Sequence, residues 1–366
     1  MKYYIFITIA LLILVSSCTK DMTSAEVDND LTIYDYQPES YILQIPEGFP
    51  QMVIPADNPL TVGGVSLGRH LFYDPILSVD STQSCSSCHL QEANFTDNLA
   101  VSTGVDGIAG RRSSMTLLNV GFHNTGLFWD GSVMTLEEQA LLPIEDPIEL
   151  HDSWPNVERK LQRHSMYPKM FREAFGIEEK QDITRELAVK AIAQFERTLI
   201  SSGESKYDRV IAGEAVFTDQ ELDGFEIFFD INEDQSQHAE CGHCHNAPLF
   251  TTNEYFNNGI DAVIAIDDFA DLARGQVTGR RFDNGAFKVP TLRNIEASAP
   301  FMHDGRFVNL DEVIDHYATG GNPADNLGAV LRPLAITDTN RAALIAFIST
   351  LRDDAFLQNS AFSSPF

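Results

Sequence analysis

The chain has 366 residues, of which 43% are hydrophobic, and its formal net charge is −28 at neutral pH. This length predicts about two domains, and the apolar content is sufficient to build folded cores. The strong negative charge argues against nucleic acid as a partner, because a nucleic-acid backbone is itself negative. It is compatible with attracting a basic protein, although solubility alone also accounts for it.

The first 17 residues are typical of a secretory signal. Lys2 is followed by an apolar run from Tyr3 to Val15, which is too short to span a bilayer in the mature protein. The run ends in Val15-Ser16-Ser17-Cys18, which is similar to a bacterial lipoprotein cleavage site. The sequence therefore predicts a periplasmic or cell-envelope protein that contacts a membrane only through a lipid anchor at Cys18. An ordinary signal peptide cut nearby is the alternative.

The rest of the chain is expected to form an arm, two compact domains and a tail. Residues 19–60 are expected to be a tether and an irregular arm, because five prolines break any long helix there. The first domain is expected over residues 61–212 and the second over residues 213–355, followed by a tail over residues 356–366.

Helical patterns dominate the two predicted domains. Apolar residues recur at helical spacing over residues 186–200 and again over residues 340–351. The segment Thr218-Asp219-Gln220-Glu221 is a capping box that predicts the start of a third helix. No sustained alternation typical of strands is present. The sequence predicts a mainly α fold with long irregular loops.

Two pentapeptides carry the chemistry of this chain. They are Cys85-Ser86-Ser87-Cys88-His89 and Cys241-Gly242-His243-Cys244-His245. Each is a C-x-x-C-H unit, in which two thiols can bind haem covalently and the histidine can ligate its iron. A zinc knuckle or a pair of redox dithiols is the alternative, but each would need a further pattern around the cysteines. Because each predicted domain carries one unit, we expect two cytochrome c-like haem domains.

Further motifs indicate an enzyme rather than a simple electron carrier. They are Leu67–Pro75, Phe128-Trp129-Asp130-Gly131, Leu136–Ala140, Val289–Asn294 and Ala299–Gly305. In this order, over about residues 60–350, they resemble the bacterial di-haem cytochrome c peroxidases. This family includes the tryptophan-modifying enzyme MauG.

The resemblance implies that hydrogen peroxide binds at the haem on His89. Glu149 then matches a glutamate that moves a peroxide proton from one oxygen to the other, and Gln139 matches a glutamine that hydrogen-bonds the bound oxygen. Trp129 matches a tryptophan that carries electrons between the haems. From the residues alone, a solvated loop acid is the favoured interpretation of Glu149, and Trp129 is a core aromatic, a role that is compatible with electron transfer.

One departure from the family pattern concerns the iron at His89. Many relatives carry a histidine in the loop that matches Ser102–Gly107, and this histidine caps the iron until the other haem is reduced. Val105 stands at that position and cannot ligate iron. The resemblance therefore implies an iron that is open to peroxide without prior reduction, with His123 as a candidate replacement ligand.

A second departure concerns the iron at His245. Many relatives have a methionine fourteen residues after the histidine that matches His303, whereas here Tyr317 stands there, as in the MauG branch. Asn309 can cap a helix that turns Tyr317 inward. A phenolate ligand would favour oxidised iron. A core tyrosine is the plainer interpretation of the spacing alone. The rival ligands are Met302 and His316.

Calcium binding stays open. Relatives often hold one Ca²⁺ between their domains through an asparagine side chain and two backbone carbonyls. The matching carbonyls belong to Ser298 and Pro300, but Ser113 stands at the asparagine position. A serine hydroxyl is the weaker ligand for a hard cation, so water would have to complete the site.

The resemblance implies a di-haem peroxidase that takes electrons from a small donor protein, either a cytochrome c or a cupredoxin. The alternative is a MauG-like oxidase that uses peroxide to modify a protein or organic substrate through a bis-ferryl-type state, which Val105 and Tyr317 favour. A non-enzymatic electron carrier or haem-storage protein would need no open iron. The sequence does not name the donor or the oligomeric state, for which a homodimer is one candidate.

Overall fold

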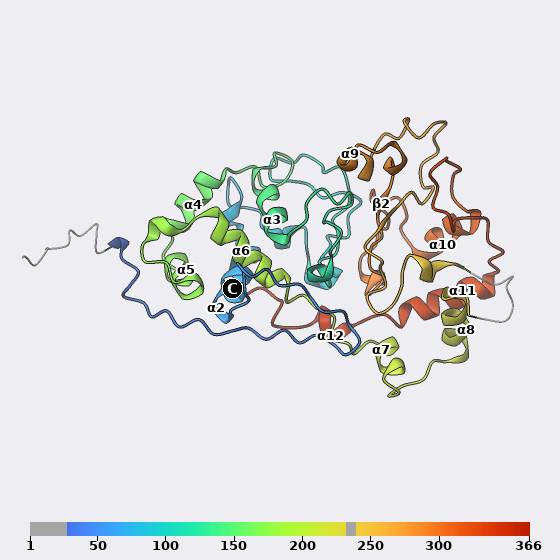
Figure 1. The fold of residues 1–366 in the computed structure, drawn as a ribbon, viewed down its shortest axis with the longest axis horizontal. Coiled ribbons are helices and arrows are strands. Elements are labelled where there is room, and N and C mark those ends of the chain that lie inside the picture. Colours follow the sequence, from blue (N-terminus) through green and yellow to red (C-terminus); the bar gives the residue numbers. More distant parts are fainter. Residues whose placement is uncertain (1–27, 232–238) are drawn as a thin grey trace, which may run out of the picture.

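The computed structural model describes residues 28–231 and 239–366, so the predicted signal peptide and Cys18 lie outside the described residues. Regular structure is almost entirely helical (Figure 1). The longer helices are α2 (Val62–Tyr73), α3 (Leu136–Glu145), α4 (Trp154–Arg163), α5 (Tyr167–Phe175), α6 (Arg185–Glu196), α8 (Asp219–Phe228), α10 (Leu310–Thr319) and α11 (Asp338–Ser349). The shorter ones are α7 (Lys206–Ile211), α9 (Arg274–Thr278) and α12 (Asp354–Leu357). Within these residues the sheet consists of β1 (Tyr255–Phe256) and β2 (Phe287–Lys288), which pair antiparallel. The predicted mainly helical fold is confirmed.

The helices predicted from apolar spacing are all present. α6 begins one residue before the predicted start, but it ends at Glu196 rather than at Ile200. α8 follows the predicted capping box, since the Thr218 hydroxyl accepts a hydrogen bond from the Glu221 N–H and the Glu221 carboxylate accepts one from the Thr218 N–H. α11 begins two residues before the predicted segment 340–351, after the cap Thr337, and ends at Ser349.

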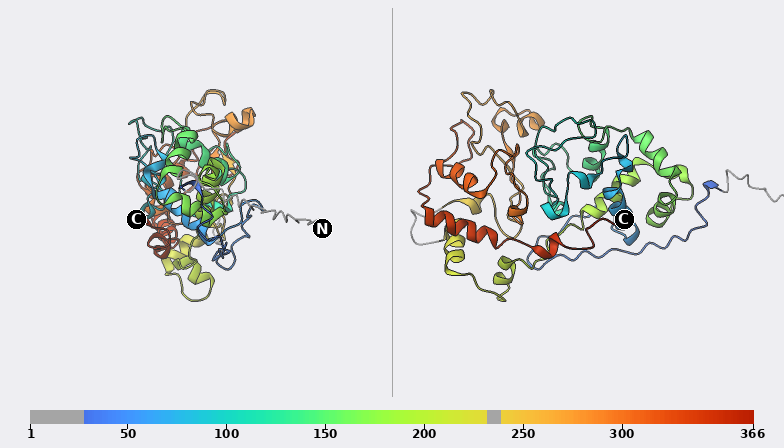
Figure 2. Two further views of the ribbon diagram at one scale, coloured as in Figure 1. Left: turned by 90° about the vertical axis from the view of Figure 1, so that its left-hand side faces the viewer. Right: turned by 180° about the vertical axis from the view of Figure 1, so that it is seen from behind.

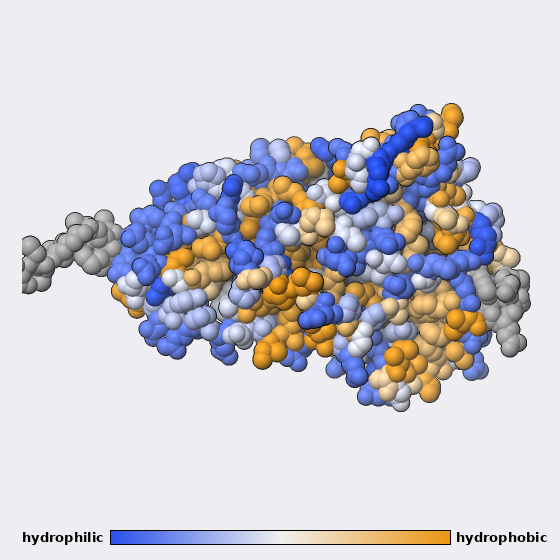
Figure 3. All heavy atoms as spheres, viewed as in Figure 1, coloured by the Kyte–Doolittle hydropathy of each residue, from blue (hydrophilic) through white to orange (hydrophobic). Residues whose placement is uncertain are grey.

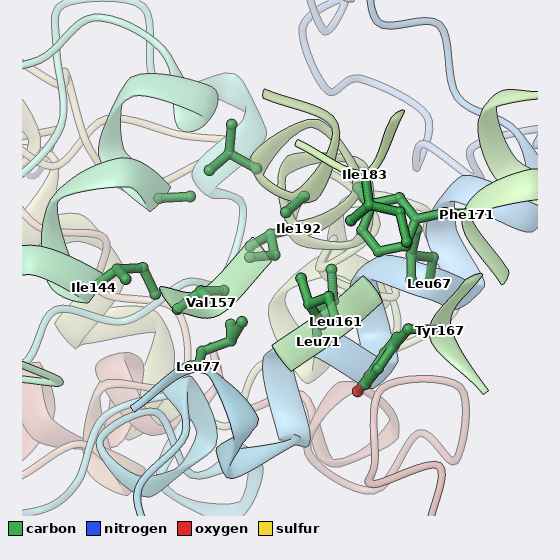
Figure 4. Close-up of a cluster of buried hydrophobic side chains, with 14 of the residues drawn as sticks. Leu67, Leu71, Leu77, Ile144, Val157, Leu161, Tyr167, Phe171, Ile183 and Ile192 are labelled. Carbon is green, nitrogen blue, oxygen red and sulfur yellow. The ribbon is translucent and has the colours of Figure 1, made fainter. Parts of the chain in front are cut away.

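The helices of the first half of the chain, α2 to α6, pack around a buried apolar cluster (Figure 4). α2 and α6 approach most closely at Gly68, where an added Cβ atom would lie 1.9 Å from the Ala191 carbonyl oxygen. Only glycine permits this approach, because any side chain would clash with the backbone of α6. α2 also contacts the short turn Cys85–Ser87, so the helix pair positions the first C-x-x-C-H unit.

The second half contains the same kind of helix pair. An added Cβ atom on Gly224 of α8 would lie 1.9 Å from the Ala343 carbonyl oxygen of α11. In each pair the next contact is the Cβ atom of a phenylalanine four residues further along the partner helix, Phe195 in the first half and Phe347 in the second. The same packing contact thus occurs twice, once beside each C-x-x-C-H unit. This repetition is a structural argument for two related domains.

Two irregular segments tie the halves together. The arm before α2 runs along one side of the molecule (Figures 1 and 2), where its Phe49 ring packs against Phe122 of the first half and lies under Arg293 of the second. The chain also returns to α2 at its C-terminus, where Phe356 and Phe362 of the predicted tail are buried in a cluster of the first half. The arm and the tail therefore limit separation of the two halves.

A buried carboxyl group lies at the end of α6. Glu196 is only 4% exposed, and its Oε2 atom has no hydrogen-bond partner among the described residues. Burial raises the pKa of Glu196 to about 8, so the folded protein keeps this group protonated at neutral pH. In the unfolded chain the same group would lose its proton near its ordinary pKa of 4.5.

We therefore expect Glu196→Gln to stabilise the protein more at high pH than at low pH. Because the folded-state pKa of Glu196 is raised, the wild type loses stability as pH rises from about 5 to about 8, by as much as about 4 kcal/mol. The variant lacks this titration. Thermal melting at about pH 5 and about pH 8.5 measures the difference, and comparing the two pH values cancels the pH-independent effect of the amide. The exposed Glu214→Gln is the control, and an equal shift at both pH values would contradict the expectation.

The visible face of the molecule carries hydrophilic residues over much of its area, with several apolar patches between them (Figure 3). This agrees with the strong negative charge of the chain. Over residues 28–231 and 239–366, none of the helices has the length and apolar character needed to cross a bilayer.

Candidate functional site

The first C-x-x-C-H unit holds its histidine in an orientation suited to an iron ligand. Cys85–Ser87 form a short 3-10 turn, and the backbone N–H of His89 donates to the Cys85 carbonyl over 3.0 Å. The ring Nδ1–H of His89 donates to the Phe95 carbonyl over 2.8 Å, which leaves Nε2 as the ligating nitrogen. Burial lowers the pKa of His89, so the ring stays in the neutral form that binds metals.

The second unit has the same local geometry. The backbone N–H of His245 donates to the Cys241 carbonyl over 2.9 Å, and the ring Nδ1–H donates to the Phe250 carbonyl over 3.2 Å. Burial lowers the pKa of His245 to about 4. Both histidines therefore present a neutral, oriented Nε2 beside two cysteines, as covalently attached haem requires.

The surroundings of the cysteines argue against the two alternatives. Burial raises the pKa of all four thiols, whereas a redox dithiol needs a lowered thiol pKa. In the part of the chain that the structure describes, no cysteine belongs to a group of three close metal-ligating side chains, as a zinc knuckle would require. The residues present fit c-type haem at both units.

Glu149 lies near the first unit. Its charge contributes to the raised pKa of both Cys85 and Cys88, which places it within electrostatic reach of both thiols. Glu149 is exposed as a residue, but the surrounding protein desolvates its carboxyl group and, with the nearby Asp146, raises the pKa of Glu149 to about 7. A carboxyl group with this pKa can both accept and return a proton near neutral pH.

The loop that contains Val105 is bonded directly to Glu149. The Val105 N–H donates to the Glu149 carbonyl over 2.8 Å. Gly104 packs so closely against the same segment that an added Cβ atom would lie 2.2 Å from the Ile148 carbonyl oxygen. The structure thus brings together Val105 and Glu149, two residues that the sequence assigned to one site from positions far apart in the chain.

Gln139 and His123 have different surroundings. Gln139 lies in α3, the helix that leads into the Glu149 segment, and is partly buried. His123 lies in the electrostatic neighbourhood of Lys288, since burial and the charge of Lys288 lower the pKa of His123 to about 3. A histidine with so low a pKa is neutral at all ordinary pH values.

Trp129 connects to the first unit through two serines. Its indole N–H donates to the Ser113 carbonyl over 2.9 Å. The next residue, Ser114, donates through its hydroxyl to the Cys88 carbonyl over 2.7 Å and lies 3.2 Å from His89 Nδ1. Short contacts therefore link the indole to the haem-attachment unit.

Trp129 also connects to the second unit. Its carbonyl accepts a hydrogen bond of 2.8 Å from the Lys288 N–H in β2. Two residues further along, the backbone of Pro290 lies near the His245 ring and opposes the fall in its pKa. A series of bonded contacts therefore runs from one haem-attachment unit to the other through Trp129.

Tyr317 and Met302 lie at one place near the second unit. Asn309 caps α10 through a 2.9 Å hydrogen bond from the Glu312 N–H to its side chain, as predicted. The Asn258 side-chain amide lies 3.4 Å from Tyr317 Oη and 3.5 Å from Met302 Sδ. Burial raises the pKa of Tyr317 to about 12, and the thiols of the second unit add to this rise.

His316 is turned toward the backbone. Its Nε2 lies 2.9 Å from the Asn258 carbonyl, so that nitrogen is engaged as a hydrogen-bond donor. Met302 and Tyr317 therefore remain the two candidate ligands that the structure brings together. Only Tyr317 would have to lose a proton to bind iron.

The sequence profile described as di-haem cytochrome c peroxidase matches residues 63–216. The methylamine utilization protein MauG of Methylorubrum extorquens is 35% identical over 314 residues, which cover 84% of this chain and 82% of that protein. The cytochrome c551 peroxidase of Nitrosomonas europaea is 32% identical over 306 residues, which cover 83% of this chain and 84% of that protein. This chain belongs to the di-haem cytochrome c peroxidase family.

A solved structure agrees with this membership. A MauG-like protein associated with microbial copper homeostasis has a TM-score of 0.81 and 31% identity, covering 89% of this chain and 99% of that one. As a di-haem cytochrome c peroxidase relative, the protein is an oxidoreductase that acts on peroxide, and the family implies a c-type haem at each C-x-x-C-H unit. Its relatives carry both names, MauG and peroxidase, so similarity does not separate these two modes.

The residues matched to the family's calcium site lie at the junction of the two halves. The Ser113 hydroxyl donates to the Met302 carbonyl over 2.9 Å, and its N–H donates to the His303 carbonyl over 2.7 Å. The Asn98 side chain donates to the carbonyls of Ala297 and Ala299, which flank Ser298. Calcium binding by Ser113, Ser298 and Pro300 therefore stays a proposal, in which the Ser113 hydroxyl would have to turn from the Met302 carbonyl to expose a lone pair.

Sequence reasoning missed Asn258 and Lys288 as site residues. Asn258 lies between the two candidate ligands, and Lys288 lies beside Trp129. An asparagine in a loop carries no signal by itself. A lysine is ordinarily expected at the surface, so the position of Lys288 before Val289–Leu292 gave no signal of its burial.

Proposed function

We propose that the protein is a peroxidase that reduces hydrogen peroxide with electrons from a small redox protein, and that it reacts without prior reduction. The observation that carries the open-site part of this proposal, a step that the oxidase alternative shares, is the contact between Glu149 and Val105; the Trp129 contacts described below support electron delivery. The backbone carbonyl of Glu149, whose side-chain carboxyl has a pKa raised to about 7, accepts a hydrogen bond from Val105, which stands where many relatives have the iron-capping histidine.

Haem held by Cys85, Cys88 and His89 would supply an iron at which the O–O bond of peroxide can break. Glu149 accepts the proton of the inner peroxide oxygen and returns it to the outer one, so that water can leave. The hydrogen bond from His89 Nδ1–H to the Phe95 carbonyl fixes the ring and makes Nε2 a more basic ligand for iron.

The contacts through Trp129 support electron delivery from the side of the second unit. The indole and its neighbours form a packed connection between the units, which an electron can follow without crossing solvent. A chain with a net charge of −28 attracts a basic donor, as a small cytochrome c or cupredoxin can be.

The second candidate is a MauG-like oxidase that uses peroxide to oxidise a protein or organic substrate. The observation that favours it is the position of Tyr317, which lies within electrostatic reach of Cys241 and Cys244. A phenolate ligand would stabilise oxidised iron and so favour the storage of oxidising equivalents. Steady-state turnover with reduced cytochrome c separates the two, because only the first candidate consumes this donor rapidly.

The deciding experiment mixes the fully oxidised protein with hydrogen peroxide in a stopped-flow spectrometer. We expect an immediate change in the haem spectrum without reductant. Val105→His should react at about one tenth of the wild-type rate or below. The reason is that only molecules in which the new histidine has dissociated from the iron can bind peroxide. Val105→Ile keeps an apolar, branched side chain and should react like the wild type. If the wild type reacts only after reduction, the proposed open site is wrong.

We also infer that the protein acts outside the cytoplasm, in the periplasm or at the cell envelope. The secretory pattern of residues 1–17 and the two haem-attachment units support this inference. Lipid anchoring at Cys18 is part of the same proposal.

A further inference from the structure

A lysine is buried at the junction of the two halves without an acidic partner. Lys288 in β2 is 1% exposed. Its Nζ atom donates to Thr125 Oγ1 and to the Asn253 carbonyl, each over 3.2 Å. Lys288 forms no ion pair among the described residues. No carboxylate of these residues therefore lies within 4.0 Å of its Nζ atom. An ammonium group has three hydrogens, and only two are engaged here.

The groups around Lys288 add positive charge rather than negative charge. Lys288 Nζ and the Arg274 guanidinium lie over the same Tyr255 ring, 5.0 Å and 4.4 Å from its centroid. Arg274 donates to the carbonyls of Asp130 and Gly131, which carry no net charge. Burial and Arg274 lower the pKa of Lys288 to about 7. The protein alone therefore does not compensate this pair of cations.

A second polar group near Lys288 is also unsatisfied. Asn253 is 6% exposed, and its Oδ1 atom is buried without a hydrogen-bond partner among the described residues. An amide side chain can present either its oxygen or its nitrogen at this position. The backbone carbonyl of Asn253 accepts from Lys288 Nζ, so this unsatisfied amide belongs to a residue in direct contact with Lys288, and a further group has hydrogen bonds to make at this polar spot.

This spot belongs to the second haem-attachment unit. The segment after His245 includes Thr252, whose N–H donates to the Cys244 carbonyl over 2.9 Å, and then Asn253. Beside it runs the segment from Lys288 to Pro290, and the backbone of Pro290 lies near the His245 ring and acts on its pKa. Both sides of the spot are therefore tied to the unit that carries His245.

We propose that Lys288 is the internal counter-ion of a propionate carboxylate of the haem attached at His245. Each haem carries two propionates, and a carboxylate in a protein interior requires a charged, hydrogen-bonded partner. A free anion is a poorer occupant, because a chain with a net charge of −28 repels it, whereas a propionate is delivered by the covalent attachment. This proposal rests on the family's two haems and not on the electron source.

The expected consequence is that the charge of Lys288 shifts the reduction equilibrium of the haem at His245. A positive charge held near a haem opposes the extra positive charge of ferric iron and so favours the ferrous state. Loss of the charge at Lys288 should shift the haem at His245 toward the oxidised form. The haem at His89, to which Lys288 connects through Trp129 and the two serines, should shift less.

The test is a spectroelectrochemical titration of the haem-loaded protein in the absence of peroxide. Lys288→Met keeps the length of the side chain and removes the charge. We expect the reduction equilibrium constant of the haem at His245 to fall about tenfold, which corresponds to about 59 mV for one electron. Lys288→Arg keeps the charge and should stay within about twofold of the wild type. The control is Lys169→Met, since Lys169 is 53% exposed in α5.

An unchanged equilibrium at the His245 haem in folded Lys288→Met would overturn the proposal, as would a shift confined to the haem at His89. If Lys288→Met cannot be loaded with haem, Lys288→Arg decides, because a shift of tenfold in a variant that keeps the charge would show that charge is not the determinant. A failure of the peroxide reaction leaves these potentials unaffected, so the two proposals fail separately.

Discussion

Replacing Glu149 by glutamine is expected to slow the reaction of the oxidised protein with hydrogen peroxide by about 10²- to 10⁴-fold. Glutamine has nearly the same size and can still donate a hydrogen bond, but it cannot accept the peroxide proton. Binding of peroxide should change much less than the step that follows it. Stopped-flow traces at several peroxide concentrations separate these two effects.

A neighbouring acid supplies the control for this prediction. Glu145 lies at the end of α3, close in sequence to Glu149 and exposed as Glu149 is, but its charge is not among those that raise the pKa values of Cys85 and Cys88. Glu145→Gln therefore removes a charge of the same sign that does not act on the first haem-attachment unit, and it should leave the rate within about twofold because solvent screens such a charge. A loss of rate as large in Glu145→Gln as in Glu149→Gln would show that net charge, and not proton transfer, is responsible.

The pH dependence of the wild type tests the same residue. The raised pKa of about 7 means that Glu149 is largely protonated below this value and ionised above it. Since the ionised form accepts the peroxide proton, the rate should rise as pH increases from about 6 to about 8, with a midpoint near the pKa. Glu149→Gln should lose this rise, whereas Glu145→Gln should keep it.

Much of the fold was predictable because its signals are local. The capping box at Thr218 and the cap at Asn309 involve residues within one helical turn, and both form as expected. The end of α6 was not predictable in this way. The apolar spacing continues to Ile200 because these residues are buried in the loop beyond the helix, and periodicity does not distinguish the two cases.

The repeated helix pair was hidden for a different reason. Gly68 and Gly224 each permit a close helix crossing, with Ala191 and Ala343 as the respective contacts. The spacing from glycine to alanine is almost equal in the two halves, at 123 and 119 residues, but it far exceeds the period of a repeat protein. Only the folded chain brings these residues together and reveals the common unit.

The candidate site likewise contains features that the local sequence predicts and features that only tertiary contacts create. The C-x-x-C-H units are local motifs, and their geometry follows from a single turn and one carbonyl. Asn258 and Lys288 act through contacts with residues that are far away in the sequence. Their roles depend on tertiary packing, which no spacing rule expresses.

Replacing Tyr317 by phenylalanine is expected to change the haem at His245 while leaving its covalent attachment intact. The phenylalanine keeps the ring in its buried position and removes only the oxygen that would bind iron. A six-coordinate, low-spin haem should become five-coordinate and high-spin, which electron paramagnetic resonance detects directly. Because a phenolate favours oxidised iron, its loss should also raise the reduction equilibrium constant by about tenfold or more.

Two matched variants make this prediction decisive. Met302→Leu removes the rival sulfur, which shares the Asn258 amide with Tyr317, and His316→Gln removes the rival imidazole, which already donates to the Asn258 carbonyl. Both should leave the spectrum of the His245 haem unchanged. If Met302→Leu alone produces the high-spin signal, methionine is the ligand, and the departure at Tyr317 loses its meaning as a sign of the MauG branch. The absence of a deprotonated phenol would then favour a haem that stores an electron, and with it the peroxidase over the oxidase.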